Sequence, residues 1–177
     1  NTIKLLNPIT PDSFKIEVDP NAKKAKVVVM DTLQYIPFTQ RREVELEVID
    51  GVVQCDTDQD VLYIAQIERY GKNGNIGKAF MGGFRFKGGA LASSVGHDNH
   101  NIIVVGDNFE DMSLAANRVA ELGGGQVVVS SGTVVAELAY PICGLLSDLP
   151  LKELSEKKRA LNSAASTMGT EIKIPFM

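Results

Sequence analysis

The chain has 177 residues, of which 44% are hydrophobic and 23% charged, and its formal net charge is −4. This mixture is typical of one ordinary globular domain or two small ones. The acidic balance and the lack of a long basic stripe argue against nucleic-acid binding, and no apolar run approaches the roughly 20 residues that span a bilayer. Cys55 and Cys143 are isolated, which indicates a reducing compartment and a cytoplasmic protein, with a disulfide between them left open.

The first half of the chain is predicted to be almost entirely β-structure. Alternating apolar and charged residues indicate strands with one wet face, whereas the continuous apolar run at 27–30 indicates a strand buried on both faces. Asp50-Gly51 predicts a two-residue hairpin turn, because both residues tolerate positive φ. Strands are expected over residues 14–19, 27–30, 43–49, 52–55, 61–70 and 76–87.

The second half is predicted to contain both strands and helices. Asp107 or Asn108 can cap a helix over about 109–122, and the three glycines at 123–125 favour its end rather than a phosphate loop. Pro150 suits the first turn of a last helix. Its core-facing stripe is expected at Leu151, Leu154, Leu161, Ala165 and Met168, and strands are expected at 90–95, 102–105, 126–130 and 133–138.

These elements predict an α+β fold with mixed, largely antiparallel sheet layers and two main helices. The polar stretch 56–60 is the best candidate boundary, which would separate an N-terminal β-rich segment at 1–60 from an α+β domain at 61–177. One continuous domain over 1–177 is the alternative. The aspartates of that stretch lack the glycine and glutamate that an EF-hand calcium loop needs at fixed offsets.

The clearest candidate for chemistry is a pair of histidines. His97 and His100 are the only histidines of the chain, and Asp98 lies between them. Imidazole titrates near neutral pH and is a common metal ligand. Residues three positions apart on one strand point to opposite faces, so a shared site requires a turn between strands 90–95 and 102–105. The simpler alternative is that both histidines only hydrogen-bond the backbone at a hairpin tip.

Two longer segments carry a resemblance to a known family. Residues 67–77 have the sequence IERYGKNGNIG, and residues 88–106 have the sequence GGALASSVGHDNHNIIVVG. They closely resemble the C-terminal domain of the bacterial and archaeal adenine deaminases of the amidohydrolase superfamily, and the similarity covers most of the chain from about Glu43 onward. The chain departs from the family pattern with Tyr70 in place of a histidine, Gly96 in place of another small residue, and Asn99 where serine is commoner.

The resemblance implies a hydrolase of purine metabolism that converts adenine and water to hypoxanthine and ammonia. In that family a (β/α)₈ barrel holds a divalent metal, manganese or iron, which activates the water. Two histidines cannot supply such a metal centre, so we expect no metal site here and no activity from this chain alone. The expected partners are the barrel domain, adenine and further copies in a homo-oligomer, whether the chain is a fragment or a free-standing relative.

The resemblance also assigns roles to the histidine segment. His97, Asp98 and His100 are the candidate catalytic residues, and Ser93, Ser94 and Asn101 are the candidate substrate-binding residues. A purine is flat and rich in ring-nitrogen acceptors, so hydrogen-bond donors on a rigid β-scaffold suit it. Two alternatives stay open. The polar groups could pair with one another inside the domain, or the chain could be a non-catalytic ligand-binding or oligomerisation module.

Overall fold

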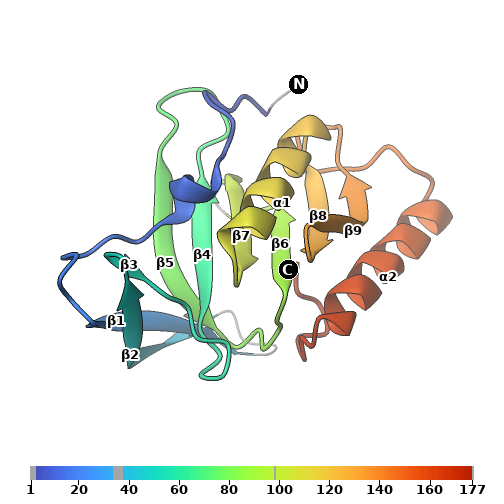
Figure 1. Cartoon of the computed structure of the whole chain (residues 1–177). Coiled ribbons are helices and arrows are strands. Elements are labelled where there is room, and N and C mark those ends of the chain that lie inside the picture. Colours follow the sequence, from blue (N-terminus) through green and yellow to red (C-terminus); the bar gives the residue numbers. More distant parts are fainter. Residues whose placement is uncertain (1–2, 34–37, 98, 177) are drawn as a thin grey trace.

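The structure, a computed structural model, describes residues 3–33, 38–97 and 99–176. Over these residues the strands form one sheet in the order β3-β2-β1-β5-β4-β7-β6-β8-β9 (Figure 1). The strands are β1 (Lys24–Thr32), β2 (Thr39–Ile49), β3 (Val52–Val53), β4 (Leu62–Ile67), β5 (Ile76–Gly82), β6 (Gly89–Ser93), β7 (Ile102–Gly106), β8 (Gly125–Ser130) and β9 (Thr133–Ala139). The helices are the 3₁₀-helix η1 (Pro11–Phe14), α1 (Phe109–Glu121) and α2 (Leu151–Thr167).

The pairing of the strands confirms the α+β prediction. β1 and β5 run parallel, and the other pairings of the described strands are antiparallel. Strands from both sides of the stretch 56–60 share this sheet, and the division of the chain into domains stays a prediction. Within the described residues no helix has the length and apolar character needed to cross a bilayer. The thiols of Cys55 and Cys143 are free.

The two main helices lie on opposite faces of the sheet, so that two hydrophobic cores form. Side chains alternate along β6: Ala92 points into the core under α1, whereas Leu91 points into the core under α2. Helix α1 packs on β6, β7 and β8, but α2 packs mainly on β8 and β9 (Figure 1). The α2 side of β4 and β5 therefore has no main helix over it.

The local turn and cap predictions for this scaffold are confirmed. Asp50 and Gly51 both have positive φ in the hairpin between β2 and β3. The side chain of Asn108 accepts a hydrogen bond from the backbone N–H of Asp111, which caps the start of α1.

Several details of the prediction are wrong, among them the expected strands over 52–55 and 76–87, which end earlier, at Val53 and Gly82. Residues 14–19 form no strand, because the chain enters through η1 and only Glu17 makes an isolated bridge, to Val52. The run 27–30 is buried on one face only: Val28 is 46% exposed, because no helix covers its side of β1. Leu151 is 81% exposed and not part of the core stripe, because the first turn of α2 extends beyond β9 (Figure 1).

Candidate functional site

The two histidines lie in the connection between β6 and β7. These strands are antiparallel neighbours, and their pairing ends at Ser93 and Ile103. The backbone N–H of His100 donates to the carbonyl oxygen of Gly96 at 2.9 Å, and His100 has a φ of +52°. The chain therefore reverses direction here, as a shared site requires. We call residues 96, 97 and 99–101 the histidine turn.

The side chains of the histidine turn differ in exposure. His97 is exposed, whereas His100 and Asn101 are half-buried. Nδ1 of His100 and Oδ1 of Asn101 are enclosed and have no hydrogen-bond partner among the described residues. Buried polar atoms are normally paired, so these two atoms retain hydrogen-bonding capacity. The candidate catalytic Asp98 lies outside the described residues.

Strand β4 and the segment that follows it hold the histidine turn in place through Asn99. The hydroxyl of Tyr70 donates to the backbone oxygen of Asn99 at 2.8 Å, and Nε2 of Gln66 donates to Oδ1 of Asn99 at 3.1 Å. The same Oδ1 accepts from the backbone N–H of Asn101 at 3.0 Å. Sequence reasoning gave Gln66 and Asn99 no role, because nothing in the local pattern shows that β4 and β7 are neighbours.

A carboxylate organises the turn that follows Tyr70. Glu68 accepts hydrogen bonds from the backbone N–H groups of Tyr70, Lys72, Asn73 and Gly74. Desolvation of the carboxylate opposes its charged form, but these four donors outweigh it, so the pKa of Glu68 lies below its ordinary value. Glu68 thus fixes the backbone from which Tyr70 reaches the histidine turn.

The two predicted substrate-binding serines hydrogen-bond the backbone. Ser94 is fully buried, and its hydroxyl donates to the carbonyl oxygen of Gly144 at 2.5 Å and accepts from the N–H of Gly125 at 2.8 Å. The hydroxyl of Ser93 accepts from the N–H of Val95 at 3.1 Å. Ser94 therefore connects the end of β6 to the loop between β9 and α2. A role in substrate binding stays a prediction for Ser93, Ser94 and Asn101.

Sequence reasoning also missed a buried arginine at this end of the sheet. Arg69 is 2% exposed, and its Nη2 donates to the carbonyl oxygen of Cys143 at 3.0 Å. Its Nε and Nη1 have no partner among the described residues. Gly144 has a φ of +71°, and a Cβ atom there would overlap Nη1, so a larger residue would strain the backbone and displace the guanidinium. The guanidinium also lies 5.2 Å from the ring centre of Tyr70, so it helps to hold the ring whose hydroxyl binds Asn99.

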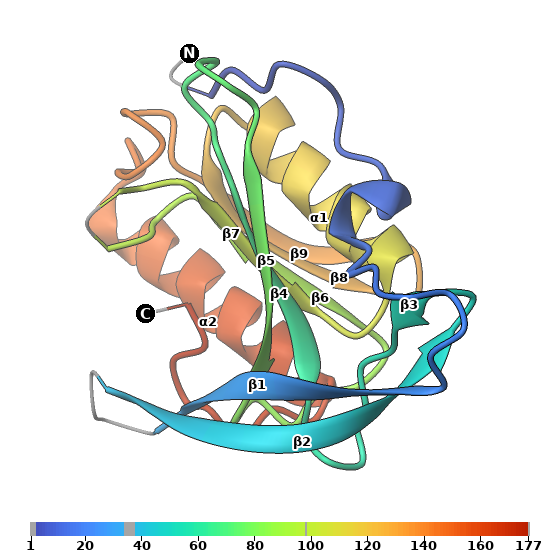
Figure 2. The same cartoon turned by 90° about the vertical axis from the view of Figure 1, so that its left-hand side faces the viewer.

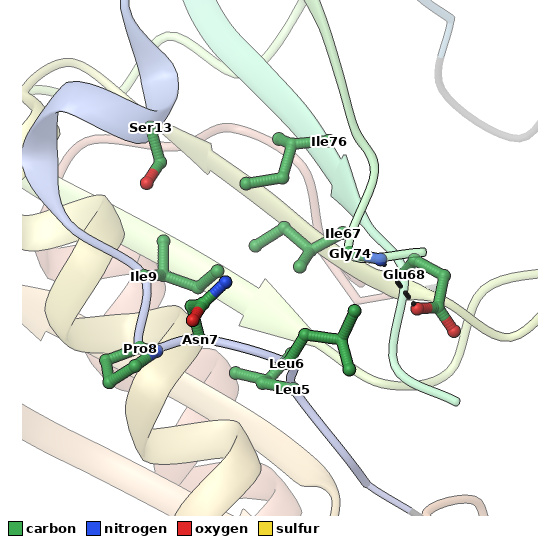
Figure 3. Close-up of a pocket in the computed structure, with 10 residues that line it drawn as sticks. All are labelled: Leu5, Leu6, Asn7, Pro8, Ile9, Ser13, Ile67, Glu68, Gly74 and Ile76. Carbon is green, nitrogen blue, oxygen red and sulfur yellow. Dashed lines mark hydrogen bonds between the residues drawn. The ribbon is translucent and has the colours of Figure 1, made fainter. Parts of the chain in front are cut away.

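Two cavities flank this end of the sheet. One, of about 220 Å³, lies between the N-terminal segment and the ends of β4 and β5 (Figure 3). Its walls combine apolar and polar groups, and Glu68 points away from it (Figure 3). The other, of about 200 Å³, lies on the opposite sheet face beside the histidine turn. It is lined by Thr32, Ile64, Met81, Phe84, Leu91, Ala92, Ser93, Val95, Ile103, Val105, Pro175 and Phe176.

The described residues do not fit the metal centre that the resemblance implies. In the described part of the chain, no three side chains of histidine, cysteine, aspartate or glutamate converge as metal ligands would. A catalytic zinc-type site needs three protein ligands, and a two-metal site needs more. We therefore assign no reaction step to a metal held by this chain.

Comparison with known proteins identifies the family of the chain. The model of the family "Adenine deaminase C-terminal domain" matches residues 37–177. The chain is 44% identical over 177 residues to a protein named adenine deaminase from Clostridium botulinum (strain Langeland), and 40% identical over 177 residues to one from Moorella thermoacetica. These alignments cover 100% of this chain, but only 29% and 30% of the two relatives, so the chain spans less than a third of their length. The chain belongs to the adenine deaminase C-terminal domain family.

Proposed function

We propose that this chain is the C-terminal domain of an adenine deaminase and that its histidine turn forms part of the purine pocket. The reaction would convert adenine and water to hypoxanthine and ammonia. The observation that carries the proposal is that both histidines lie on one turn, which Tyr70 and Gln66 hold through Asn99. The chain also aligns along its full length with proteins named adenine deaminase. The rest of the pocket would come from a barrel domain outside this chain.

The chemistry of the turn suits a purine. Adenine offers ring-nitrogen acceptors and an amino donor, and imidazole and amide groups can satisfy both. His97 is exposed, and within the described part of the chain His100 and Asn101 each have one polar atom without a hydrogen-bond partner. Tyr70 and Gln66 hold the turn through Asn99, so little ordering entropy remains to be lost on binding.

The catalytic role that we propose is proton transfer. When water adds to the amino-bearing carbon of adenine and the C–N bond breaks, the leaving amino group takes up a proton. His97 and His100, with Asp98 to orient an imidazole, are the groups of this chain that would supply it. The manganese or iron of the proposed enzyme would be bound by the barrel. Cytoplasmic location, a place in purine metabolism and homo-oligomeric assembly belong to the same proposal.

The test is mutation of the two histidines in the full-length enzyme. We expect His97→Ala or His100→Ala to lower kcat/KM by about 10²- to 10⁴-fold while melting temperature and metal content stay close to those of the parent, as for loss of a positioned acid-base group. Lys152→Ala, an exposed change on α2, is the matched control and should keep full activity. The purified 177-residue chain should release ammonia only at background.

Two outcomes would contradict the proposal. A His97→Ala enzyme that melts several degrees lower but turns over normally would show that the turn only supports the fold. Metal-dependent ammonia release by the isolated chain would show that a barrel is not needed.

A further inference from the structure

Among the described residues, the α2 side of the sheet is only partly covered at Val28, Met30, Ile64 and Ile103. Leu62 and Val105 on the same side are buried in the second core. Figure 2 shows β5, β4 and β7 nearly edge-on, with α1 on one side and α2 on the other, and the hairpin β1–β2 running across the view below them. A hollow of about 350 Å³ on this side is lined by residues of β1, β4, β5 and β7. We call this surface the open face. It carries the side chains of Val28, Met30, Ile64, Gln66, Ala79 and Ile103.

The centre of the open face is apolar and partly exposed. Val28 is 46% exposed and Met30 is 36% exposed, while Ile64 and Ile103 are half-buried. Their neighbours on the other side of the same strands, such as Val29, are in the core under α1. Alternating strands normally place polar residues on a face that stays in water. The apolar side chains here therefore indicate a face that becomes covered.

The surroundings of the open face have the layout of a protein interface. On the same side of β1 and β2, Lys26 and Arg41 form ion pairs with Glu43, and Lys24 pairs with Glu45, so charges lie at one margin of the apolar centre. An apolar centre with a polar rim is the usual anatomy of a protein–protein contact.

The open face also contains a recess for a side chain. The 200 Å³ cavity beside the histidine turn shares Ile64 and Ile103 with the hollow, and its remaining walls are mostly apolar. Phe176 of the C-terminal tail closes one side, where its backbone oxygen accepts from Nε2 of Gln126. Such a recess suits one bulky apolar side chain, the kind of anchor that dominates interface energies.

The open face is continuous with the histidine turn. Gln66 lies on the face and donates to Asn99, and Ser93, the last residue of β6, lines the recess. Any protein that covers the open face therefore lies next to His97 and His100.

We propose that the open face is the surface on which the rest of the deaminase chain packs, with one of its apolar side chains in the recess. This inference rests on the proposed function. The aligned relatives have more than two thirds of their length outside the region that this chain covers. The proposed function places that remainder beside the histidine turn, and the open face is a partly exposed apolar surface of the described residues that adjoins the turn. A second copy of this chain is the competing occupant.

Thiol labelling tests the inference directly. Met30→Cys is made in a Cys143→Ser background, both in the 177-residue chain and in the full-length enzyme, and the rate of reaction with a small maleimide is measured. Burial raises the pKa of the Cys55 thiol to about 12, so Cys55 stays unreactive. We expect Met30→Cys to react at least ~10-fold more slowly in the full-length enzyme than in the isolated chain, because covering a thiol blocks reagent access.

Val135→Cys, at a 49% exposed position on β9, should react at similar rates in both proteins. Val28→Cys replaces Met30→Cys if circular dichroism shows that the first variant is misfolded. Equal rates for Met30→Cys in both proteins would overturn the inference. Slow labelling in both, with a dimeric mass for the isolated chain, would assign the face to a second copy. Neither result affects the histidine test of the proposed function.

Discussion

Ser94 and His97 are three residues apart, yet their surroundings call for different roles. The hydroxyl of Ser94 is enclosed and bonded to two backbone groups from distant segments. The imidazole of His97 is exposed at the outer end of the same connection. The first residue therefore positions the histidine turn, and the second is available to a ligand or another domain.

This difference predicts a separation between stability and activity. Ser94→Ala leaves the N–H of Gly125 and the carbonyl of Gly144 without a buried partner, so we expect the free energy of unfolding to fall by about 1–3 kcal/mol. His97→Ala at an exposed position should change it by less than about 0.5 kcal/mol. Urea denaturation of the isolated chain measures both. Similar losses for the two variants would refute the assignment of Ser94 as a positioning residue.

At the level of elements, helix α2 contributes to the core through only part of its length. Leu161 and Ala165 are fully buried against the second core, whereas Leu151 at the first turn is 81% exposed. The helix therefore anchors to β8 and β9 through its second half. Its first half follows the loop between β9 and α2, in which the carbonyl oxygen of Gly144 accepts a hydrogen bond from Ser94.

Two leucine substitutions on this helix provide a matched test. Leu161→Ala removes a fully buried side chain and should lower the free energy of unfolding by about 2–5 kcal/mol, since it leaves a cavity. Leu151→Ala should lower it by no more than about 0.5 kcal/mol. Thermal or urea unfolding of the isolated chain reports the difference. A large loss for Leu151→Ala would mean that this leucine is covered in solution.

At the scale of the whole molecule, a lysine joins α2, the sheet and the C-terminal tail. Nζ of Lys158 donates to Oε1 of Gln126 at 2.5 Å and lies 5.1 Å from the ring centre of Phe176. The hydroxyl of Tyr140 donates to the same Gln126 oxygen at 3.0 Å. Burial lowers the pKa of Lys158 from 10.5 to about 8.

This pKa predicts how stability depends on pH. Between about pH 8 and 10.5 the unfolded chain holds the Lys158 proton while the folded chain has lost it, so the free energy of unfolding rises with pH in this window. Relative to Lys158→Met, the parent chain should gain stability as pH increases from 8 to 10. Lys157→Met, at an exposed neighbour, serves as the control. A constant difference between parent and Lys158→Met across this range would contradict the prediction.

The elements whose signals are local could be predicted from the amino-acid sequence. The Asp50-Gly51 hairpin, helix α1 with its Asn108 cap, and the strands on either side of the histidines follow from residues close together in the chain. The family resemblance likewise depended on continuous segments, and the family match over 37–177 confirms it. Turn geometry, capping and side-chain periodicity act over a few residues, so they are visible without a fold.

The surfaces and partners that these elements acquire depend on how the chain packs in three dimensions. The contacts of Asn99 with Tyr70 and of Arg69 with Cys143 join residues 29 and 74 positions apart. The exposure of Val28 and Leu151 depends on where helices lie over the sheet, and an apolar pattern is the same whether or not a helix covers it. Burial and long-range hydrogen bonds are properties of strand order and layer packing, which local patterns do not specify.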